Sequence, residues 1–187
     1  MTDPRSAAVR AAVPDDADVV AATCEEGYRR ASAGLVPASI VDERARTFYA
    51  RTRVASDIAG AGPWSGYLVV EEDRLVLGAV GGLLTRPRSE VVVLYLRWDQ
   101  RGRGLGRLLL ESLTARHRDA GAQEQRVTVT EGNDHALPFY AAAGFAPAGR
   151  EPYARTPTGA VTVWSLRMHR RLVPTDRGPA RSRPSLA

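Results

Sequence analysis

A run of arginines and glycines, Arg101-Gly102-Arg103-Gly104-Leu105-Gly106-Arg107, is the segment of the sequence best suited to binding an anion. Its glycines allow sharp turns and let a ligand approach the peptide groups closely. The leucines that follow have helical spacing, so the run opens a predicted helix, whose first N–H groups lack partners and carry partial positive charge. Arginine side chains also suit phosphate geometry. The residues therefore predict a phosphate or pyrophosphate site, as for a phosphorylated cofactor.

Glycine-rich loops occur in several kinds of nucleotide site, and two of these fit poorly. The phosphate-binding loop of nucleoside triphosphatases ends in Gly-Lys-Ser/Thr, whereas Arg107 follows Gly106 here and the chain has no lysine. The dinucleotide fingerprint Gly-x-Gly-x-x-Gly needs a different glycine spacing, and no second βαβ half follows. On this loop alone, a turn that only joins a strand to a helix stays an open interpretation.

The elements that must position the loop are a strand before it and a helix after it. Residues 91–96 are six apolar residues in a row, which favours a strand covered on both faces. The helix is predicted to end near Gly121, and a further strand is predicted at residues 126–131. A helix that connects two strands implies that the strands are parallel. The apolar face of the helix is predicted to comprise Leu105, Leu108, Leu109 and Leu113.

The remaining elements predict an α/β chain with consecutive hairpins before the central strand. The expected segments are a strand at 8–13, helices at 17–30 and 39–53, a loop at 60–66, a strand pair at 67–71 and 75–84, a short helix between Asn133 and Gly144, and a last strand pair at 145–153 and 160–168. We expect a flexible N-terminus at residues 1–7, one domain at 8–169, and a disordered tail rich in arginine, proline and serine at 170–187.

The composition narrows the class of protein. The chain has 187 residues, 44% hydrophobic and 25% charged, which fits one globular domain. No apolar run approaches the roughly 20 residues that a membrane span needs, and no secretory signal is recognisable. The single cysteine, Cys24, excludes an internal disulfide and agrees with the cytoplasm. The net charge of +5 comes from arginines scattered among 21 acidic residues, which favours a solvated surface over nucleic-acid binding.

Two blocks of the sequence resemble motifs of the GNAT N-acetyltransferases. Leu94-Tyr95-Leu96 followed by residues 101–109 resembles the acyl-CoA-binding signature of that family, Arg/Gln-x-x-Gly-x-Gly/Ala after a strand that ends in Leu-Tyr-Val. Residues 133–145 resemble its Asn-x-x-Ala-x-x-Phe-Tyr…Gly-Phe motif, and the two blocks follow in the family's order. The resemblance covers roughly residues 8 to 170. One departure is Trp98, where the family often has proline.

The resemblance implies an α/β GNAT fold, with a mixed, mostly antiparallel central sheet flanked by helices and a parallel strand pair that splays apart. It implies acetyl-CoA as the co-substrate, with the pantetheine arm in the gap between the parallel strands. The residues implied to hold the pantetheine are Leu96, Arg97 and Trp98, with Asn133 reaching the arm. Those implied to hold the pyrophosphate are Arg101, Gly102, Arg103, Gly104, Leu105, Gly106 and Arg107.

The implied reaction, attack of an amine on a thioester, has three chemical needs. A base or a water must take the proton of the amine, and Glu90 stands eleven residues before Arg101, where some family members carry their general base. A backbone N–H near Leu96 could stabilise the oxyanion. Tyr140 occupies the position of the family's tyrosine and could protonate the leaving thiolate. Packing of Tyr140 against Phe139, and a solvated Glu90, stay open as structural alternatives.

The other chemistry-bearing residues have weaker patterns. Four further carboxylates that could act through water are not ranked by the sequence: Glu25, Glu26, Glu71 and Glu72. The histidines lack spaced partners and are predicted to be surface residues: His117, His135 and His169. Cys24 is expected to be a small core residue, and no metal site is expected. Three aromatic residues are candidates for either the acceptor pocket or the core: Phe48, Tyr49 and Trp64.

The sequence thus predicts an N-acetyltransferase that moves an acetyl group from acetyl-CoA to a primary amine, preferably of a small molecule, by direct attack in a ternary complex. A protein or peptide N-terminus as acceptor and a longer acyl-CoA as donor remain alternatives within the fold. A domain that binds acyl-CoA without turnover and a nucleic-acid-binding protein are alternatives of other classes. We expect no membrane partner, and pairing into a homodimer is left open.

Overall fold

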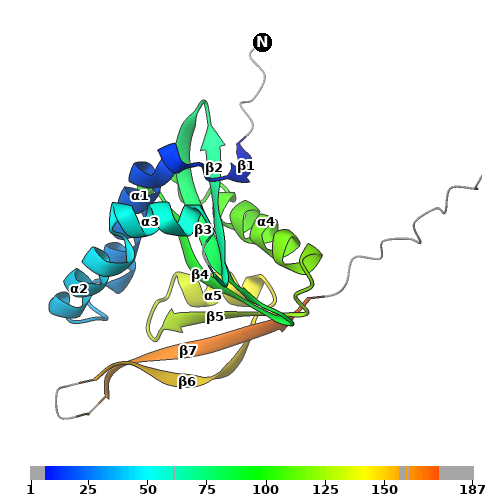
Figure 1. The fold of residues 1–187 in the computed structure, drawn as a ribbon. Coiled ribbons are helices and arrows are strands. Elements are labelled where there is room, and N and C mark those ends of the chain that lie inside the picture. The colour runs from blue at the N-terminus through cyan, green and yellow to red at the C-terminus, as the bar shows by residue number, and fades with distance from the viewer. Residues whose placement is uncertain (1–6, 61, 156–158, 160, 173–187) are drawn as a thin grey trace, which may run out of the picture.

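Seven strands of the computed structural model form one sheet, in the order β1-β2-β3-β4-β5-β7-β6 (Figure 1). The structure describes residues 7–60, 62–155, 159 and 161–172. All neighbouring strands are antiparallel except β4 and β5, which are parallel, so the prediction of a mixed, mostly antiparallel sheet is confirmed. The strands are β1 (Ala8–Ala11), β2 (Trp64–Glu72), β3 (Leu75–Thr85), β4 (Arg88–Leu96), β5 (Glu124–Thr130), β6 (Ala146–Arg155) and β7 (Val161–Arg171).

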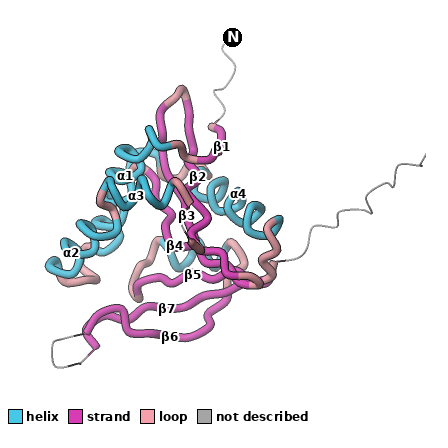
Figure 2. Tube along the Cα trace, viewed as in Figure 1, coloured by secondary structure: helices cyan, strands magenta, loops and turns pink. Residues whose placement is uncertain are grey.

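Helices cover both faces of this sheet, as the continuously buried residues of β2 and β3 require (Figure 2). The helices are α1 (Ala17–Ser32), α2 (Ala38–Phe48), α3 (Arg51–Ile58), α4 (Leu105–Asp119) and α5 (Ala136–Ala142), with short 3₁₀ turns η1 (Pro14–Asp16) and η2 (Trp98–Gln100). Tyr67 and Val69 of β2 pack with the helices α1, α2 and α3, whereas their neighbours Leu68 and Val70 pack with α4 and α5. Two apolar layers therefore enclose the sheet.

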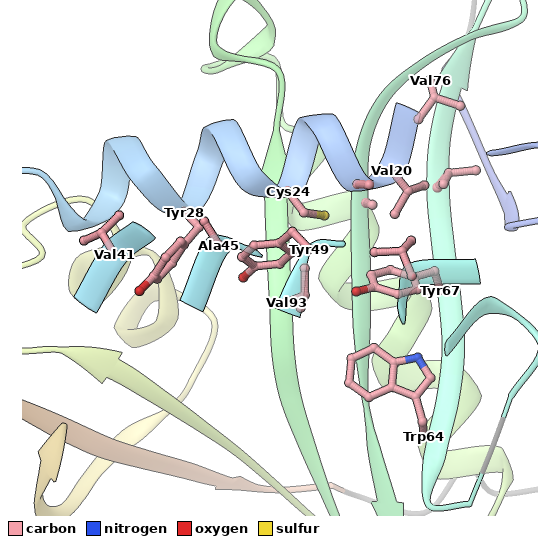
Figure 3. Close-up of a cluster of buried hydrophobic side chains, with 14 of the residues drawn as sticks. Val20, Cys24, Tyr28, Val41, Ala45, Tyr49, Trp64, Tyr67, Val76 and Val93 are labelled. Atoms are coloured by element: carbon pink, nitrogen blue, oxygen red, sulfur yellow. The ribbon is translucent and has the colours of Figure 1, made fainter. Parts of the chain in front are cut away.

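The layer under α1 is rich in aromatic side chains (Figure 3). Val20, Cys24 and Tyr28 point from α1 toward the sheet, one helical turn apart. The expectation that Cys24 is a core residue is confirmed, since its side chain is fully buried. Tyr28 packs against Tyr49 with 5.5 Å between the ring centroids. Tyr28 and Tyr49 also line one of the two cavities described below.

The parallel strands β4 and β5 separate after only four residue pairs. Arg88 to Val91 pair with Glu124 to Val127, and no pair follows. At the same point β4 carries a bulge, because Gly82 of β3 pairs with Val91 and Gly81 pairs with Val93, which leaves Val92 without a partner. A bulge bends its strand and increases the local twist. The last residues of β4 consequently turn away from β5 and keep one backbone edge open.

Several sequence expectations differ from the structure in detail. The helix expected at 39–53 is two helices, α2 and α3, separated at Tyr49 and Ala50. The loop expected at 60–66 ends early, since β2 begins at Trp64. On α4, Leu108 is 36% exposed whereas Leu110 is 1% exposed. Leu110 projects closer to the line through Leu109 and Leu113 that faces the sheet, and Leu108 lies on its flank.

The last strand also continues past the expected end of the domain at residue 169. β7 ends at Arg171, and Leu172 is buried with its N–H donated to the carbonyl of Gln123 over 2.8 Å. The expected tail therefore begins inside a strand. The rest of that tail, residues 173–187, the N-terminal residues 1–6 and most of the turn expected at 156–159 lie outside the described residues.

Candidate active site

The glycine-rich loop has the backbone conformation that its sequence demands. Gly102 and Gly104 both have φ of +78°, a region that L side chains rarely adopt. Gly104 is the residue before α4, and the first backbone hydrogen bond of the helix runs from Leu108 N–H to the Gly104 carbonyl over 3.1 Å. The N–H groups of Leu105, Gly106 and Arg107 therefore have no acceptor within the helix. They form a positive, donor-rich end suited to a phosphate.

The arginines around this end have different partners. The guanidinium of Arg101 lies 4.4 Å from the centre of the Trp98 ring and has no carboxylate partner among the described residues. Arg107 pairs with Glu111 over 2.8 Å, one turn along α4. Arg103 donates two hydrogen bonds to Glu72, of 2.8 and 3.0 Å. Arg101 is accordingly the arginine of this loop with most donor capacity left for a ligand.

A cavity of about 630 Å³ runs from this loop along the open edge of β4 to α5. It falls within the volume range of small-molecule and cofactor sites. Of the residues that the sequence assigned to the cofactor, Arg97 and Arg103 do not line the cavity. Arg97 pairs instead with Asp99 over 3.5 Å. The assigned residues that do line it are Leu96, Trp98, Arg101, Gly102, Gly104, Leu105, Gly106, Arg107 and Asn133.

Several lining residues of this cleft were not found from the sequence, and three of them are informative: Gly27, Arg30 and Arg170. The guanidinium of Arg30, on α1, lies 4.9 Å from the centre of the Trp98 ring, which Arg101 also contacts. Gly27, one turn earlier, lets α1 approach β4, because a Cβ there would lie 2.5 Å from Tyr95. A glycine inside a helical pattern is a signal of such an approach. Arg170 closes the far end of the cleft, and no sequence pattern pointed to it.

A second cavity of about 350 Å³ adjoins the first. Both cavities are lined by Leu94 and Tyr95 of β4 and by Tyr140 of α5. Phe48 and Tyr49 line the second cavity, whereas Trp64 is buried in the core. A ligand held in the first cavity can therefore present a group to a ligand in the second at the place where β4 and β5 separate.

Tyr140 lies between two other rings at this junction. Its ring centroid is 5.1 Å from that of Phe139 and 5.4 Å from that of Phe145, both in edge-to-face geometry. Burial raises the pKa of Tyr140, and the charge of Arg170 partly offsets this. The phenol therefore keeps its proton at neutral pH and can donate it. Packing and proton donation are both compatible with the geometry, since the ring lines both cavities.

Glu90 lies in the second cavity, on β4 two residues before the bulge at Val92. Burial raises its pKa, and the negative charge of Glu151 raises it further, whereas Arg126 acts in the opposite direction. Within the described residues, Glu90 has no ion pair. A half-buried carboxylate with a raised pKa, in a cavity and without a partner, has the properties of a general base.

The other carboxylates considered from the sequence have arginine partners. Glu71 pairs with Arg10, and Glu72 with Arg103. Glu25 and Glu26 pair with Arg29 and Arg30 at helical spacing. None of the four lines the second cavity, and only Glu26 lines the first. The tertiary structure thus ranks carboxylates that the sequence left equal.

His117 is not a surface residue, and that expectation is wrong. Its side chain is fully buried under the sheet, with Nε2 2.8 Å from the hydroxyl of Ser65. Burial, and next the charge of Arg116, lower its pKa to about 4. His117 faces the sheet because it continues the buried line of Leu109 and Leu113 on α4. It lines neither cavity and belongs to the core.

Asn133 has a structural task besides the one expected of it. Its side-chain oxygen accepts hydrogen bonds from the N–H groups of Ala136 and His135, over 2.9 and 3.3 Å. It therefore caps the turn that leads into α5. Its amide NH₂ group remains for a ligand, since Asn133 also lines both cavities.

Two negative findings apply to the described residues only. None of the helices there is long and apolar enough to cross a bilayer. No cluster of three or more histidine, cysteine or acidic side chains with metal-binding geometry occurs in that part of the chain.

Comparisons with known proteins agree with this arrangement. The family model described as "Acetyltransferase (GNAT) family" matches residues 36–145, more than half of the chain. A solved structure of the PaiA N-acetyltransferase of Thermoplasma acidophilum, in complex with coenzyme A, is 18% identical with a TM-score of 0.75, over 89% of this chain and 99% of that one. No curated protein matches the sequence.

Two further solved structures share the fold. The ribosomal-protein-S18-alanine N-acetyltransferase of Escherichia coli is 16% identical with a TM-score of 0.65, over 91% of this chain and 98% of that one. The putative acetyltransferase YncA of Salmonella typhimurium, solved with acetyl-CoA, is 19% identical with a TM-score of 0.62, over 97% and 99% of the two chains. At these identities the likeness concerns the fold.

Proposed function

This chain belongs to the acetyltransferase (GNAT) family and is an acyltransferase, and we propose that it moves the acetyl group of acetyl-CoA to the primary amine of a small molecule. The transfer takes place by direct attack in a ternary complex. The observation that carries the proposal is the meeting of the two cavities at Tyr140 and Leu94. One cavity has a phosphate-binding helix start, the other an unpaired carboxylate, and a thioester at the junction is reachable from both.

The first cavity fits the parts of coenzyme A. The free N–H groups at the start of α4 and the guanidinium of Arg101 suit its pyrophosphate. The unpaired backbone edge of β4 beyond Val91 suits the amide-containing arm, which can add to the sheet as another strand would. Acetyl-CoA supplies an activated acetyl group, and the residues of this chain bind it and handle the protons.

Each proton in the reaction has a candidate residue. The amine nitrogen attacks the thioester carbon, and Glu90 takes the proton of the amine, directly or through a water. A backbone N–H on the open edge of β4 stabilises the oxyanion of the tetrahedral intermediate. The C–S bond then breaks, and Tyr140 gives its proton to the leaving thiolate sulfur. The phenol of Tyr140 is protonated at neutral pH, so a proton is available for the last step.

The test is the release of free coenzyme A thiol from acetyl-CoA in the presence of a panel of primary amines. We expect thiol release that depends on the amine, with a product whose mass is increased by one acetyl group. Calorimetric titration with coenzyme A measures binding separately. Binding without turnover on any amine or peptide would leave only the alternative of a non-catalytic acyl-CoA sensor. Absence of binding to well-folded protein contradicts the proposal as a whole.

One alternative acceptor has specific support. The E. coli structure that shares this fold is named as an enzyme that acetylates the alanine of a ribosomal protein. Peptides with a free N-terminus therefore belong in the panel. If peptides are acetylated and small amines are not, the small-molecule part of the proposal is wrong and the acetyl transfer stands.

A reducing compartment, the cytoplasm, is part of the proposal because the one cysteine, Cys24, is a buried thiol rather than half of a disulfide.

A further inference from the structure

The second cavity contains both an unpaired negative group and an unpaired positive group. Its charged lining residues are Arg44, Glu90 and Glu151. Glu151 has a partner, since its carboxylate lies 3.5 Å from the guanidinium of Arg167. Glu90 and Arg44 have no ion pair in the described part of the chain. The two free charges come from different walls, Glu90 from β4 and Arg44 from α2.

Arg44 has most of its hydrogen-bonding capacity free. Its guanidinium carbon lies 4.2 Å from the centre of the Tyr153 ring, so the ring face holds the cation in place. Its one hydrogen bond to the described part of the chain is long, 3.5 Å from Nη2 to the Tyr153 carbonyl. A guanidinium has five N–H donors and suits two-point binding of a carboxylate or phosphate group. Arg44 is therefore held in position and available to an anion.

Two tyrosine hydroxyls next to Arg44 add a further donor. The hydroxyl oxygens of Tyr28 and Tyr153 lie 2.8 Å apart, in hydrogen-bond contact. Each phenol carries one proton, and the contact uses one of the two, so the other can be donated to a ligand. Burial raises the pKa of Tyr153, which keeps the phenol protonated. The positive charge of Arg44 and the free proton of the tyrosine pair together favour an anionic oxygen over a cation.

We propose that the acceptor amine also carries an anionic oxyacid group, a carboxylate or a phosphonate, as amino acids and aminoalkylphosphonates do. This inference rests on the proposed function and names the substrate class for it. The ammonium end is attracted by Glu90, which then takes its proton, and the anionic end binds Arg44 and the Tyr28–Tyr153 pair. A zwitterion leaves no unpaired charge in the cavity. A diamine would place its second cation against Arg44, where like charges repel.

The experiment compares acceptors that differ only in the anionic group. Leucine, leucinamide and isoamylamine form one set, and 4-aminobutyrate, 3-aminopropylphosphonate and butylamine form another, with putrescine as the dication. In the set whose amines are acetylated faster, we expect kcat/KM to be at least about tenfold higher for the amine with an acid group than for the amine without one. This is the size of effect expected for a charge-assisted contact. The two anionic arms of the second set distinguish carboxylate from phosphonate.

Variants of α2 show whether Arg44 causes the preference. Arg44→Gln should bring the ratio of kcat/KM between acid and uncharged amine close to one, chiefly through KM of the acid, and Arg44→Lys should restore part of it. Arg46→Gln is the matched control, since Arg46 is an exposed arginine of the same helix and lines neither cavity. It should keep the wild-type ratio.

Each outcome decides between the two proposals. Equal turnover of acids and uncharged amines, a preference for putrescine, or an unchanged ratio in Arg44→Gln overturns this inference and leaves acetyl transfer standing. If no amine is acetylated, binding of the acids to coenzyme A-saturated protein is measured by calorimetry. Binding that Arg44→Gln weakens about tenfold would then support the anionic subsite while the proposed function fails. No binding of any acid overturns the inference.

Discussion

Val91 of β4 and Val127 of β5 form the last residue pair between the two parallel strands. Beyond this pair β4 continues for five residues to Leu96 with one backbone edge unpaired, and both cavities open along it. The bulge at Val92 lies immediately after the pair, which explains why the strands separate here. The position of one unpaired residue thus decides where the two cavities meet.

Gly104→Val should weaken coenzyme A binding while the fold is retained. The substitution forces a β-branched residue into φ of +78° and changes the start of α4, at a conformational cost of about 1–2 kcal/mol. We expect Kd to rise at least about tenfold by calorimetry. Gly144→Val is the control, because Gly144 has φ of +85° and open space around it but lines neither cavity. Equal binding by the two variants would contradict the loop assignment.

Tyr140→Phe should lower turnover without loss of cofactor binding. The variant keeps the ring between Phe139 and Phe145 and removes only the proton donor. General acid catalysis contributes about 10²-fold or more, so we expect kcat to fall by that order with Kd for coenzyme A unchanged. Tyr67→Phe removes the hydroxyl of a tyrosine buried elsewhere in the core and serves as the control. Unchanged kcat in Tyr140→Phe would show that the ring only packs.

The pH profile should identify Glu90 as the base. A base works when deprotonated, so activity should rise with pH through the pKa of Glu90, which burial and Glu151 raise above its ordinary value. Glu90→Gln should abolish this rise, the acid limb of the pH profile, and lower kcat by about 10²-fold. Glu151→Gln removes the repelling charge, so the pKa of Glu90 falls and the limb moves to lower pH. A limb that stays in place in both variants would exclude Glu90.

His117 should make the protein less stable in acid. Its pKa is about 4 in the folded protein against an ordinary 6.5, so below pH 6.5 the unfolded chain binds a proton that the folded chain refuses. The free energy of unfolding should fall by about 3 kcal/mol between pH 7 and pH 4. Urea unfolding of His117→Gln should show a shallower dependence over this range. The exposed His135→Gln should keep the wild-type slope, and equal slopes in all three proteins would contradict the assignment.

Two truncations test where the domain ends. We propose that residues up to Leu172 belong to it, because Arg170 donates hydrogen bonds of 2.7 Å to Gln125, 2.6 Å to Thr114 and 2.5 Å to the Ala143 carbonyl. Removal of residues 173–187 should leave the melting temperature and coenzyme A binding unchanged. Removal of residues 170–187 should lower the free energy of unfolding by roughly 3 kcal/mol, since it leaves buried hydrogen-bond acceptors unpaired. Equal stability of the two truncations would place the boundary at residue 169.

The sequence by itself determined the elements and the cofactor loop. Hydrophobic periodicity and glycine positions act over a few residues, so β4, the loop and α4 were predictable from local pattern alone. Gly102 and Gly104 have the positive φ angles that their residue type suggested. Two family motifs in order then implied the fold and acetyl-CoA. The break between α2 and α3 at Tyr49 and the burial of Leu110 instead of Leu108 on α4 were not predicted, because side-chain packing rather than backbone propensity sets them.

Only the tertiary structure decided which charged groups remain free. The sequence singled out Glu90 and left four further carboxylates unranked. Those four are paired with arginines, whereas Glu90 has no ion pair among the described residues. Arg44 and Glu90 are 46 residues apart in the chain and line one cavity, because α1 packs against both α2 and β4. His117 shares the buried face of α4 with Leu109 and Leu113, and only the folded structure brings Ser65 within hydrogen-bond distance of it. The pairs of Glu25 and Glu26 follow from helical spacing, but those of Glu71 and Glu72 and the isolation of Glu90 depend on residues far apart in the chain, which no local pattern encodes.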